Sequence, residues 1–378
     1  MLACCRALRD VETLSEQLVG RSGLGRAARR RVPDTTLDGL LRKAQPEPFV
    51  AKLHAQVREM KRGGGLEPMV GLPCGVVTMD GKALATMDRK VNESCQHHEQ
   101  EGGEYWLQRA VRTVLTSSEV KVCVHQTMIP AATNDMGVFE ASYAELLAAY
   151  GASDLFGIVT CDAGFTSLHN ATLVSDSGRD YVFGLKDNQP ALHDKAQQLL
   201  LEEISRAEPE GSTDWEKRDG GWMRRSLWRS RGLNDLNGWA HLQQTWMVVQ
   251  EKRDAAGDTA VSEVRFFVTS LQWERLSALQ CLHVVRAHWG IENDSNWSAD
   301  ALWREDHGVW CTQNNAVEVL GLLRLLACNV LQQLRQRHLP DRDAGGQRGP
   351  AMRWQELFAW VRTVLLHDDV APVVTAGG

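Results

Sequence analysis

The first 65 residues carry apolar side chains at the spacing of helices. Residues 11–18 and 36–60 both repeat apolar positions at helical intervals, the second with interruptions at Pro46 and Pro48. Three consecutive glycines at 63–65 then mark a linker. We therefore predict a helical N-terminal region over residues 1–65.

After this linker the pattern changes to alternating strands and helices. Apolar runs bounded by turn residues predict strands at 75–80, 105–115, 120–129, 155–162 and 180–185. Helical spacing predicts helices at 136–150, 166–177 and 190–207. Three strands, then a helix, a strand, a helix, a strand and a helix form an RNase H-like order. We expect an α/β fold whose RNase H-like mixed-sheet core begins with residues 70–207.

The rest of the chain divides where the pattern changes again. Residues 208–272 have the pattern of antiparallel strands separated by Gly, Asn and Asp turns, which indicates a β-rich insertion. Residues 273–337 are mostly helical and are expected to complete the core. Residues 338–378 are expected to form a loop and a last amphipathic helix at 354–366.

Composition excludes several classes of protein. With 43% hydrophobic and 24% charged residues the chain has globular composition, which excludes wholesale disorder and fibrous structure. Its apolar stretches are shorter than the roughly 18 residues of a membrane span, and its first residues lack a signal-peptide pattern. The nine cysteines are scattered without a Cys-x-x-Cys pair, which disfavours a disulfide framework or a zinc site. We expect a cytoplasmic protein without membrane contact.

Charge is distributed unevenly along the chain. Residues 1–65 hold 13 Lys and Arg against 7 Asp and Glu, although the whole chain has a net charge of −6. A basic segment attached to an acidic body points toward a polyanionic partner such as nucleic acid. The acidic body leaves room for clustered carboxylates that bind metal.

Two acids close predicted strands of the core. Asp80 ends the strand at 75–80, and Asp162 ends the strand at 155–162. The first and fourth strands of an RNase H-like sheet are neighbours, so both carboxylates are expected side by side at one edge of the sheet. Taken singly, each aspartate is more simply interpreted as the start of a turn after a strand.

A third acid stands in the helical part of the core. On a helix, His288, Glu292 and Asn296 fall at i, i+4 and i+8 and form one polar stripe. If this helix packs against the two strands, Glu292 meets Asp80 and Asp162. Three converging carboxylates repel one another unless a divalent cation neutralises them, and Mg²⁺ prefers such oxygen ligands. Two ions about 4 Å apart can activate an attacking hydroxyl and stabilise a leaving oxygen in phosphodiester displacement.

Each of these residues also has a purely structural interpretation. Glu292 alone fits an exposed helix face, and His288 beside Trp289 fits a packing histidine. Asp300, Glu305 and Asp306 could assist the site, but a charge run at a helix end is their default interpretation. The three acids favour a metal site because they occur in the right order, each in its expected local context.

Three segments together resemble a known family. They are Met79-Asp80-Gly81-Lys82; Thr160-Cys161-Asp162-Ala163 followed by residues 180–189; and Arg286-Ala-His288-Trp289-Gly-Ile-Glu292-Asn293 through Glu305-Asp306. Covering roughly residues 70–335, they resemble a bacterial insertion-sequence transposase of the DDE class, in the branch that includes the H-repeat-associated proteins.

The resemblance implies a function and a set of site residues. Asp80, Asp162 and Glu292 match the catalytic acids, which bind Mg²⁺ or Mn²⁺ for DNA cleavage at transposon ends and strand transfer to target DNA. The partners it implies are the terminal inverted repeats and target DNA, bound by a homodimer. Asn188 and Gln189 match a segment that touches DNA or orders the site. The expected DNA-contacting residues are His288, Lys82, Lys186, Asn188, Gln189, Arg286 and Asn293.

The sequence departs from the family pattern at several positions. Asn296-Trp297 stands where relatives often have His-Trp, and Ala299-Asp300-Ala301 stands where they usually have Leu-Asp-Val. None of these changes removes a proposed metal ligand. They leave open two alternatives, a catalytically inactive DNA-binding protein derived from a transposon and a nuclease of the same fold.

Overall fold

A computed structural model shows a mixed α/β fold built on one large sheet. It describes residues 5–19, 30–100, 102–204, 207–218, 221–233, 238–239, 241–289, 291, 300, 303–305, 310–313, 315–337 and 352–366. The strands are β1 (Val76–Met87), β2 (Gln96–Gln100), β3 (Gly103–Leu115), β4 (Val122–Ile129), β5 (Ile158–Cys161), β6 (Asp180–Leu185), β7 (Gly211–Ser212), β8 (Glu216–Arg218), β9 (Gly221–Ser230), β10 (Gln244–Arg253) and β11 (Thr259–Thr269).

The helices lie where the apolar spacing predicted them. They are α1 (Leu8–Gln17), α2 (Asp34–Lys43), α3 (Glu47–Arg62), α4 (Asp135–Tyr150), α5 (Leu168–Asp176), α6 (Pro190–Ile204), α7 (Ala278–His288), α9 (Ala316–Arg337) and α10 (Trp354–Leu366). The predicted helical segment 36–60 is divided into α2 and α3 at Pro46, because proline cannot donate a helical hydrogen bond. Side-chain caps start α4 and α5, where Asn134 and Ser167 accept from backbone N–H groups three residues later.

The first half of the sheet contains the predicted core strands. Its order is β4-β3-β1-β5-β6. β2 also pairs with β3, over residues 103–107, whereas β4 pairs with residues 109–115. Strand β3 is antiparallel to β1, β2 and β4, whereas β5 and β6 run parallel to β1. All four residues of β5 are buried, as expected of a short parallel strand covered on both faces.

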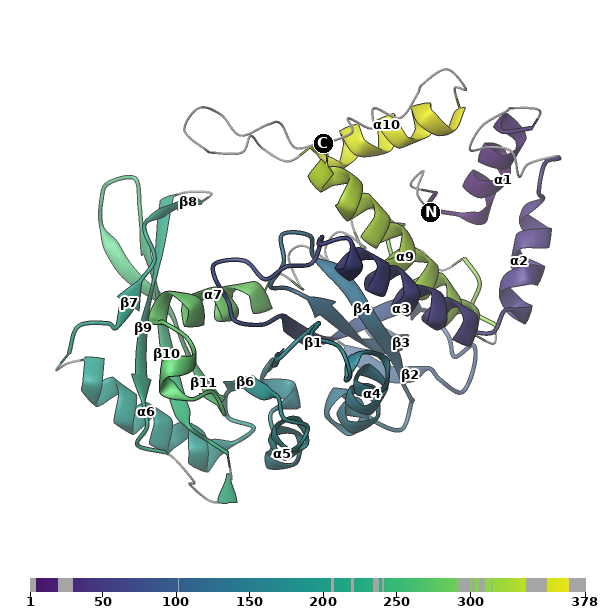
Figure 1. Ribbon diagram of the computed structural model, residues 1–378. Coiled ribbons are helices and arrows are strands. Elements are labelled where there is room, and N and C mark those ends of the chain that lie inside the picture. The colour runs from purple at the N-terminus through teal and green to yellow at the C-terminus, as the bar shows by residue number, and fades with distance from the viewer. Residues whose placement is uncertain are drawn as a thin grey trace, which may run out of the picture.

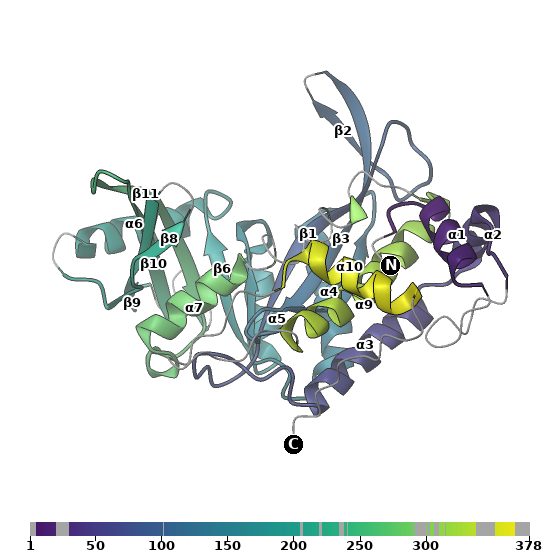
Figure 2. The ribbon, with the colours of Figure 1, turned by 90° about the horizontal axis from the view of Figure 1, so that it is seen from above.

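The second half of the sheet comes from the segment predicted as a β-rich insertion. Its strands β9, β10 and β11 form an antiparallel meander, and β7 and β8 add to β9. β11 pairs with β6, so these strands continue the core sheet directly (Figure 1). Figure 2 shows this half of the molecule beside the core and the β2–β3 hairpin extending away from both.

Helices cover both faces of the sheet. Phe139 of α4, Ala171 of α5 and Ala196 of α6 belong to one core cluster with the strands. Val284 and Val285 of α7 pack with β-strand residues in a second cluster, and Leu322 of α9 packs in a third. Alternate residues of β1 follow this division, since Val77 and Met79 lie in the first cluster and Val76 lies in the second.

Helix α9 is long and apolar enough, by length and composition, to cross a membrane. Two thirds of its apolar window (67%) is buried against the rest of the chain, and it contacts α3, β4 and β1. Arg324 on this helix is 3% exposed and lies near Glu305. The helix thus fills the position of a core helix.

Candidate functional site

The pairing of β1 with β5 brings the two predicted aspartates together. Met79 lies opposite Cys161 in the parallel register. Asp80 directly follows Met79, and Asp162 directly follows Cys161. One residue pair earlier on the same face, Thr78 and Thr160 join through their hydroxyls at 2.8 Å. The charges of both aspartates add to the burial that raises the pKa of the Cys161 thiol.

The prediction that Asp80 ends its strand is wrong. β1 continues to Met87, and Asp80 pairs there with Arg112 of β3. The strand continues because the long antiparallel β3 supplies hydrogen bonds after the short β5 has ended. The aspartates therefore meet where the parallel pairing ends, within the sheet for Asp80 and just after β5 for Asp162.

Asp162 lies in surroundings that disfavour its charged form. Its carboxyl is open to a cavity, but desolvation by the surrounding protein raises its pKa, and the charge of Asp135 adds to this effect. The backbone N–H of Gly164 and the ammonium of Lys186 act in the opposite direction. A cation bound beside this carboxylate would relieve the same repulsion.

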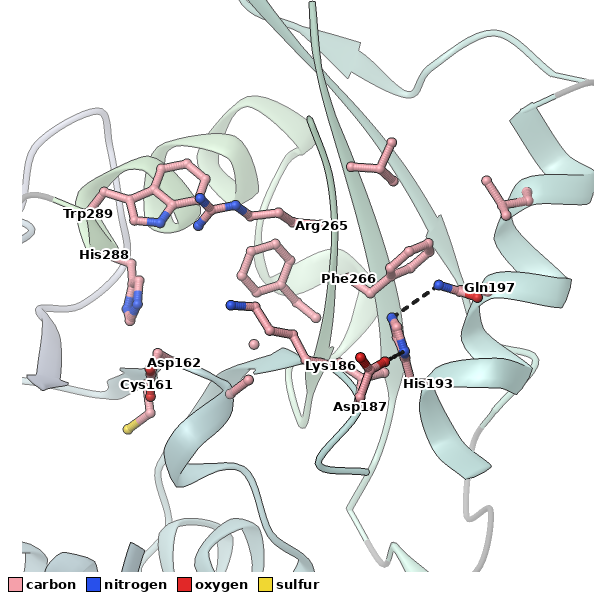
Figure 3. A pocket seen from close by; sticks show the side chains of 16 residues that line it. Cys161, Asp162, Lys186, Asp187, His193, Gln197, Arg265, Phe266, His288 and Trp289 are labelled. Atoms are coloured by element: carbon pink, nitrogen blue, oxygen red, sulfur yellow. Dashed lines mark hydrogen bonds and ion pairs between the residues drawn. The ribbon is translucent and has the colours of Figure 1, made fainter. Parts of the chain in front are cut away.

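The cavity has a volume of about 510 Å³ and lies between the core strands, β11, α6 and the end of α7. Asp162, Lys186, Arg265 and Trp289 all line it. The Arg265 guanidinium lies 4.1 Å from the ring centroid of Trp289 and also pairs with Glu263. Figure 3 shows Lys186 extending between Asp162 and Arg265, so acidic and basic groups face one space. Such a space can hold a phosphate near a carboxylate site.

His288 anchors the end of α7 to the strand that precedes Asp162. It is 8% exposed, and its Nδ1 lies 3.2 Å from the hydroxyl of Thr160. Burial lowers its pKa to about 4, with a smaller contribution from the charge of Arg265. The imidazole is therefore neutral at pH 7. His288 was expected to contact a phosphate as a basic residue, but a neutral imidazole brings no positive charge to such a contact.

Two other residues expected to contact DNA form ion pairs with acidic residues of this chain. Lys82 is buried and pairs with Asp300. Arg286 lies exposed on α7 and pairs with Glu216 of β8. Each pairing ties two parts of the fold together, so both cations have a structural role in addition to any contact with DNA.

The segment that follows β6 is held by side-chain amides. Asn188 donates to the backbone carbonyls of Ala163 and Thr166, the second at 3.2 Å. Gln189 donates to the carbonyl of Thr166 at 3.1 Å. These bonds attach the Lys186–Gln189 segment to the turn that begins at Asp162. Of the two roles expected for Asn188 and Gln189, ordering the site is the one that their hydrogen bonds serve.

Glu292 and Asn296 of the predicted polar stripe, and the expected DNA contact Asn293, lie outside the described residues. Helix α7 ends at His288, with Trp289 as its C-cap. Among the residues that the structure describes, no three His, Cys, Asp or Glu side chains form a group able to hold a metal ion. That part of the chain contributes two candidate ligands, Asp80 and Asp162.

Glycine between Asp80 and Lys82 has a steric reason. A Cβ on Gly81 would lie 2.3 Å from Oδ1 of Asp135 and 2.8 Å from Nη2 of Arg109. These two residues form an ion pair at 2.8 Å. The absent side chain thus lets a charged pair approach the backbone next to Asp80.

The sequence interpretation missed a buried ion pair beside Asp80. Glu305, for which the default was a charge run at a helix end, is fully buried and forms two hydrogen bonds of 2.7 Å with Arg112. The available signal was that Arg112 stands in a strand with apolar Val111 just before it and apolar Val114 two residues after it. That signal identifies an unusual position but does not identify its partner.

The fold and the paired aspartates define an α/β protein with an acidic site where the parallel pairing of β1 and β5 ends. Comparison with known families is more specific, because the family model described as "Transposase DDE domain" matches residues 75–330. The chain belongs to this family of DDE transposase domains. The match confirms the predicted resemblance.

Individual relatives agree with this assignment at low identity. The chain is 25% identical over 185 residues to the H repeat-associated putative transposase YhhI of Escherichia coli K12, covering 46% of this chain and 47% of that protein. It is 22% identical over 246 residues to the putative transposase YncI of Escherichia coli O157:H7, covering 59% of this chain and 60% of that protein. The chain spans about half the length of the curated relatives it matches.

A solved structure is also similar, the piggyBac transposase synaptic complex with hairpin DNA. The TM-score is 0.43 at 11% identity, and the alignment covers 91% of this chain and 66% of that chain.

Proposed function

We propose that this chain is an active DNA transposase that cleaves DNA at transposon ends and joins the freed 3′ end to target DNA. The observation that carries the proposal is the register of β1 and β5, which sets Asp80 beside Asp162 in a chain of the DDE family. The expected partners are the terminal inverted repeats and target DNA, bound by a homodimer in the cytoplasm.

The proposed catalytic core is RNase H-like. The order β4-β3-β1-β5-β6, with β5 and β6 parallel to β1, supports this assignment. In it, residues 70–207 form the first part of the core, 208–272 the β-rich insertion and 273–337 the helical part that carries Glu292. Residues 1–65 and 338–378 are the flanking helical regions.

The donor set at the end of the parallel pairing fits a divalent cation. Asp80 and Asp162 offer carboxylate oxygens, and the raised pKa of Asp162 reflects a position where added positive charge is favourable. Asp80, Asp162 and Glu292 would hold Mg²⁺ or Mn²⁺. The chemistry that such a metal supplies is activation of a hydroxyl nucleophile and neutralisation of charge on phosphate oxygens.

The remaining side chains of the cavity would orient the DNA. Lys186 and Arg265 supply positive charge within about 510 Å³ of space next to Asp162. Asn188 and Gln189 hold the segment that presents Lys186. Orientation of the scissile phosphate by fixed groups contributes through proximity and through electrostatic stabilisation of the transition state.

The test is a cleavage and joining assay with purified protein, Mg²⁺ and DNA that carries the inverted repeats flanking the gene. Asp80→Asn and Asp162→Asn are expected to lower the nicking rate by about 10³-fold or more, the equivalent of several kcal/mol of metal-based stabilisation. Asp154→Asn is the matched control, because Asp154 precedes β5 and its side chain is 87% exposed. Undiminished nicking by either site variant contradicts the assigned roles.

Two other results would replace the proposal. Nicking without any joining of strands would indicate a nuclease of the same fold. Metal-independent binding to the repeats without nicking would indicate an inactive DNA-binding protein.

A further inference from the structure

A network of buried charges lies next to Asp80. Arg112 of β3 is directly opposite Asp80 in the antiparallel register and is 0% exposed. Its two terminal nitrogens donate to both carboxylate oxygens of Glu305 at 2.7 Å. Its Nε donates to Oε1 of Gln126, the register partner of Arg112 on β4, at 3.1 Å. The guanidinium is therefore fixed on three sides.

Glu305 reaches this position from a distant part of the sequence. It follows α7 in the chain and is separated from Arg112 by 193 residues. Arg324 of α9 approaches the same carboxylate at 3.7 Å. Burial alone would raise the pKa of Glu305, but the charge and hydrogen bonds of Arg112 outweigh it and lower that pKa. The pair is thus ionised although both side chains are fully buried.

A second ion pair lies beside the first. Lys82 follows Asp80 by two residues on β1 and so lies on the same face of the strand. It is buried and pairs with Asp300. Asp80 is thus flanked by two cations, one opposite it on β3 and one farther along β1. Both cations hold acids from residues 300–305.

Earlier in the sequence than Asp300 and Glu305, His288 at the end of α7 is attached to β5. Hydrogen bonding between His288 and Thr160 secures the end of α7 two residues before Asp162. The sequence between His288 and Asp300 contains Glu292. The attachments on both sides of that sequence are therefore made to the strands that carry Asp80 and Asp162.

A buried ion pair is an inefficient way to stabilise a fold. Removing two charges from water carries a large desolvation cost, and well-packed apolar residues of similar volume often stabilise a protein as well or better. A bidentate pair between a guanidinium and a carboxylate instead restricts the relative orientation of its two groups. This geometry suits the alignment of two chain segments better than it suits stability.

We propose that Arg112 and Glu305 are positioning residues for DNA cleavage. Their ion pair holds Glu305, and with it the adjoining described residues Trp303 and Arg304, in one orientation against β1 and β3, and cleavage depends on that orientation. Neither residue touches the substrate. This inference rests on the proposed transposase function and adds to it a pair of residues outside the acidic triad.

The test replaces both partners by apolar residues. Arg112→Met combined with Glu305→Leu removes both charges of the bidentate pair, and Arg324 keeps its contact with the ring of Trp310, 5.6 Å from the guanidinium to the ring centroid, so the double variant is expected to remain folded in a urea titration. Its single-turnover nicking rate is expected to fall at least tenfold, and the Mg²⁺ concentration for half-maximal nicking to rise. Arg231→Met with Glu274→Leu is the matched control, because that pair has a similar separation of 2.9 Å but is 52% and 79% exposed. The control is expected to nick at the parent rate.

A near-isosteric variant covers the case in which the double variant does not fold. Glu305→Gln keeps the shape of the side chain and breaks the bidentate pairing, and its nicking rate is expected to fall at least tenfold while DNA affinity stays within twofold of the parent. A folded variant that nicks at the parent rate overturns the positioning role alone. A parent protein that does not nick overturns both the proposed function and this inference.

Discussion

The hydroxyl of Thr160 provides a direct test of how the end of α7 is held near Asp162. Thr160 is 1% exposed, and its Oγ1 lies 2.8 Å from the hydroxyl of Thr78 and 3.2 Å from Nδ1 of His288. Thr160→Val keeps the side-chain shape but removes both interactions, together with the 3.4 Å hydrogen bond that the hydroxyl donates to the carbonyl of Val77. Thr78 retains a partner in Thr116, at 3.1 Å, whereas Nδ1 of His288 is left buried without Thr160.

The expected cost follows from that unpaired nitrogen. A buried polar group that loses its partner destabilises the folded state by about 1–3 kcal/mol. With an m-value of about 3 kcal/mol/M, the urea midpoint should fall by roughly 0.3–1 M. Unfolding followed by tryptophan fluorescence measures this shift, and the fall is expected at constant m-value.

A second threonine in the same sheet is the matched control. Thr245 is 0% exposed, and its Oγ1 has no hydrogen-bond partner among the described residues. Thr245→Val removes an unsatisfied hydroxyl, so it is expected to leave stability unchanged or to raise it by about 1 kcal/mol. Equal losses for Thr160→Val and Thr245→Val would show that the hydrogen bonds of Thr160 do not decide the cost, and would refute the reasoning.

Three further predictions concern other parts of the chain. His54 and His288 have pKa values lowered to about 4, chiefly by burial, so the unfolded state protonates first as pH falls. These two histidines leave the free energy of unfolding at its full value above about pH 6.5. Between pH 6.5 and 4 it should fall by at most about 1.4 kcal/mol per pH unit for each histidine. His54→Gln should flatten the urea midpoint measured against pH, and an unchanged slope would contradict this assignment. Gly81→Ala should lower the free energy of unfolding by about 1–3 kcal/mol through overpacking. The control Gly39→Ala on α2 should raise it by about 0.5–1 kcal/mol, because no atom lies within 4 Å of the new methyl group. Similar urea midpoints for the two variants would rule out the steric explanation. Lys186→Ala should weaken DNA binding and reduce the slope of log affinity against log salt by about one, and an unaltered slope would exclude a phosphate contact.

Much of the fold follows from patterns that are local in the sequence. The helices α4, α5 and α6 and the strands β3, β4, β5 and β6 lie close to their predicted ranges, because apolar periodicity reports which face of an element is buried. β1 extends past its predicted end, since its length depends on the reach of β3. The pairing of β6 with β11 could not be predicted from the sequence either, because pairing between strands distant in sequence leaves no local periodicity.

The candidate site divides in the same way. Asp80, Asp162 and Glu292 were selected by order and local context, and the family assignment follows from the same segments. The neutral state of His288 could not be read from its sequence neighbours, because it arises from burial against β5.

The amino-acid sequence by itself determined the helices, most strands and membership of the DDE transposase family, because these depend on short-range patterns and motifs. Only the tertiary structure decided which residues became partners: Asp80 beside Asp162, Arg112 with Glu305, and Lys82 with Asp300. Burial and charge pairing depend on distances through space between residues far apart in the chain. Desolvation and charge pairing together set the ionisation of each group. Desolvation makes His288 neutral, and pairing with Arg112 keeps Glu305 ionised although it is buried.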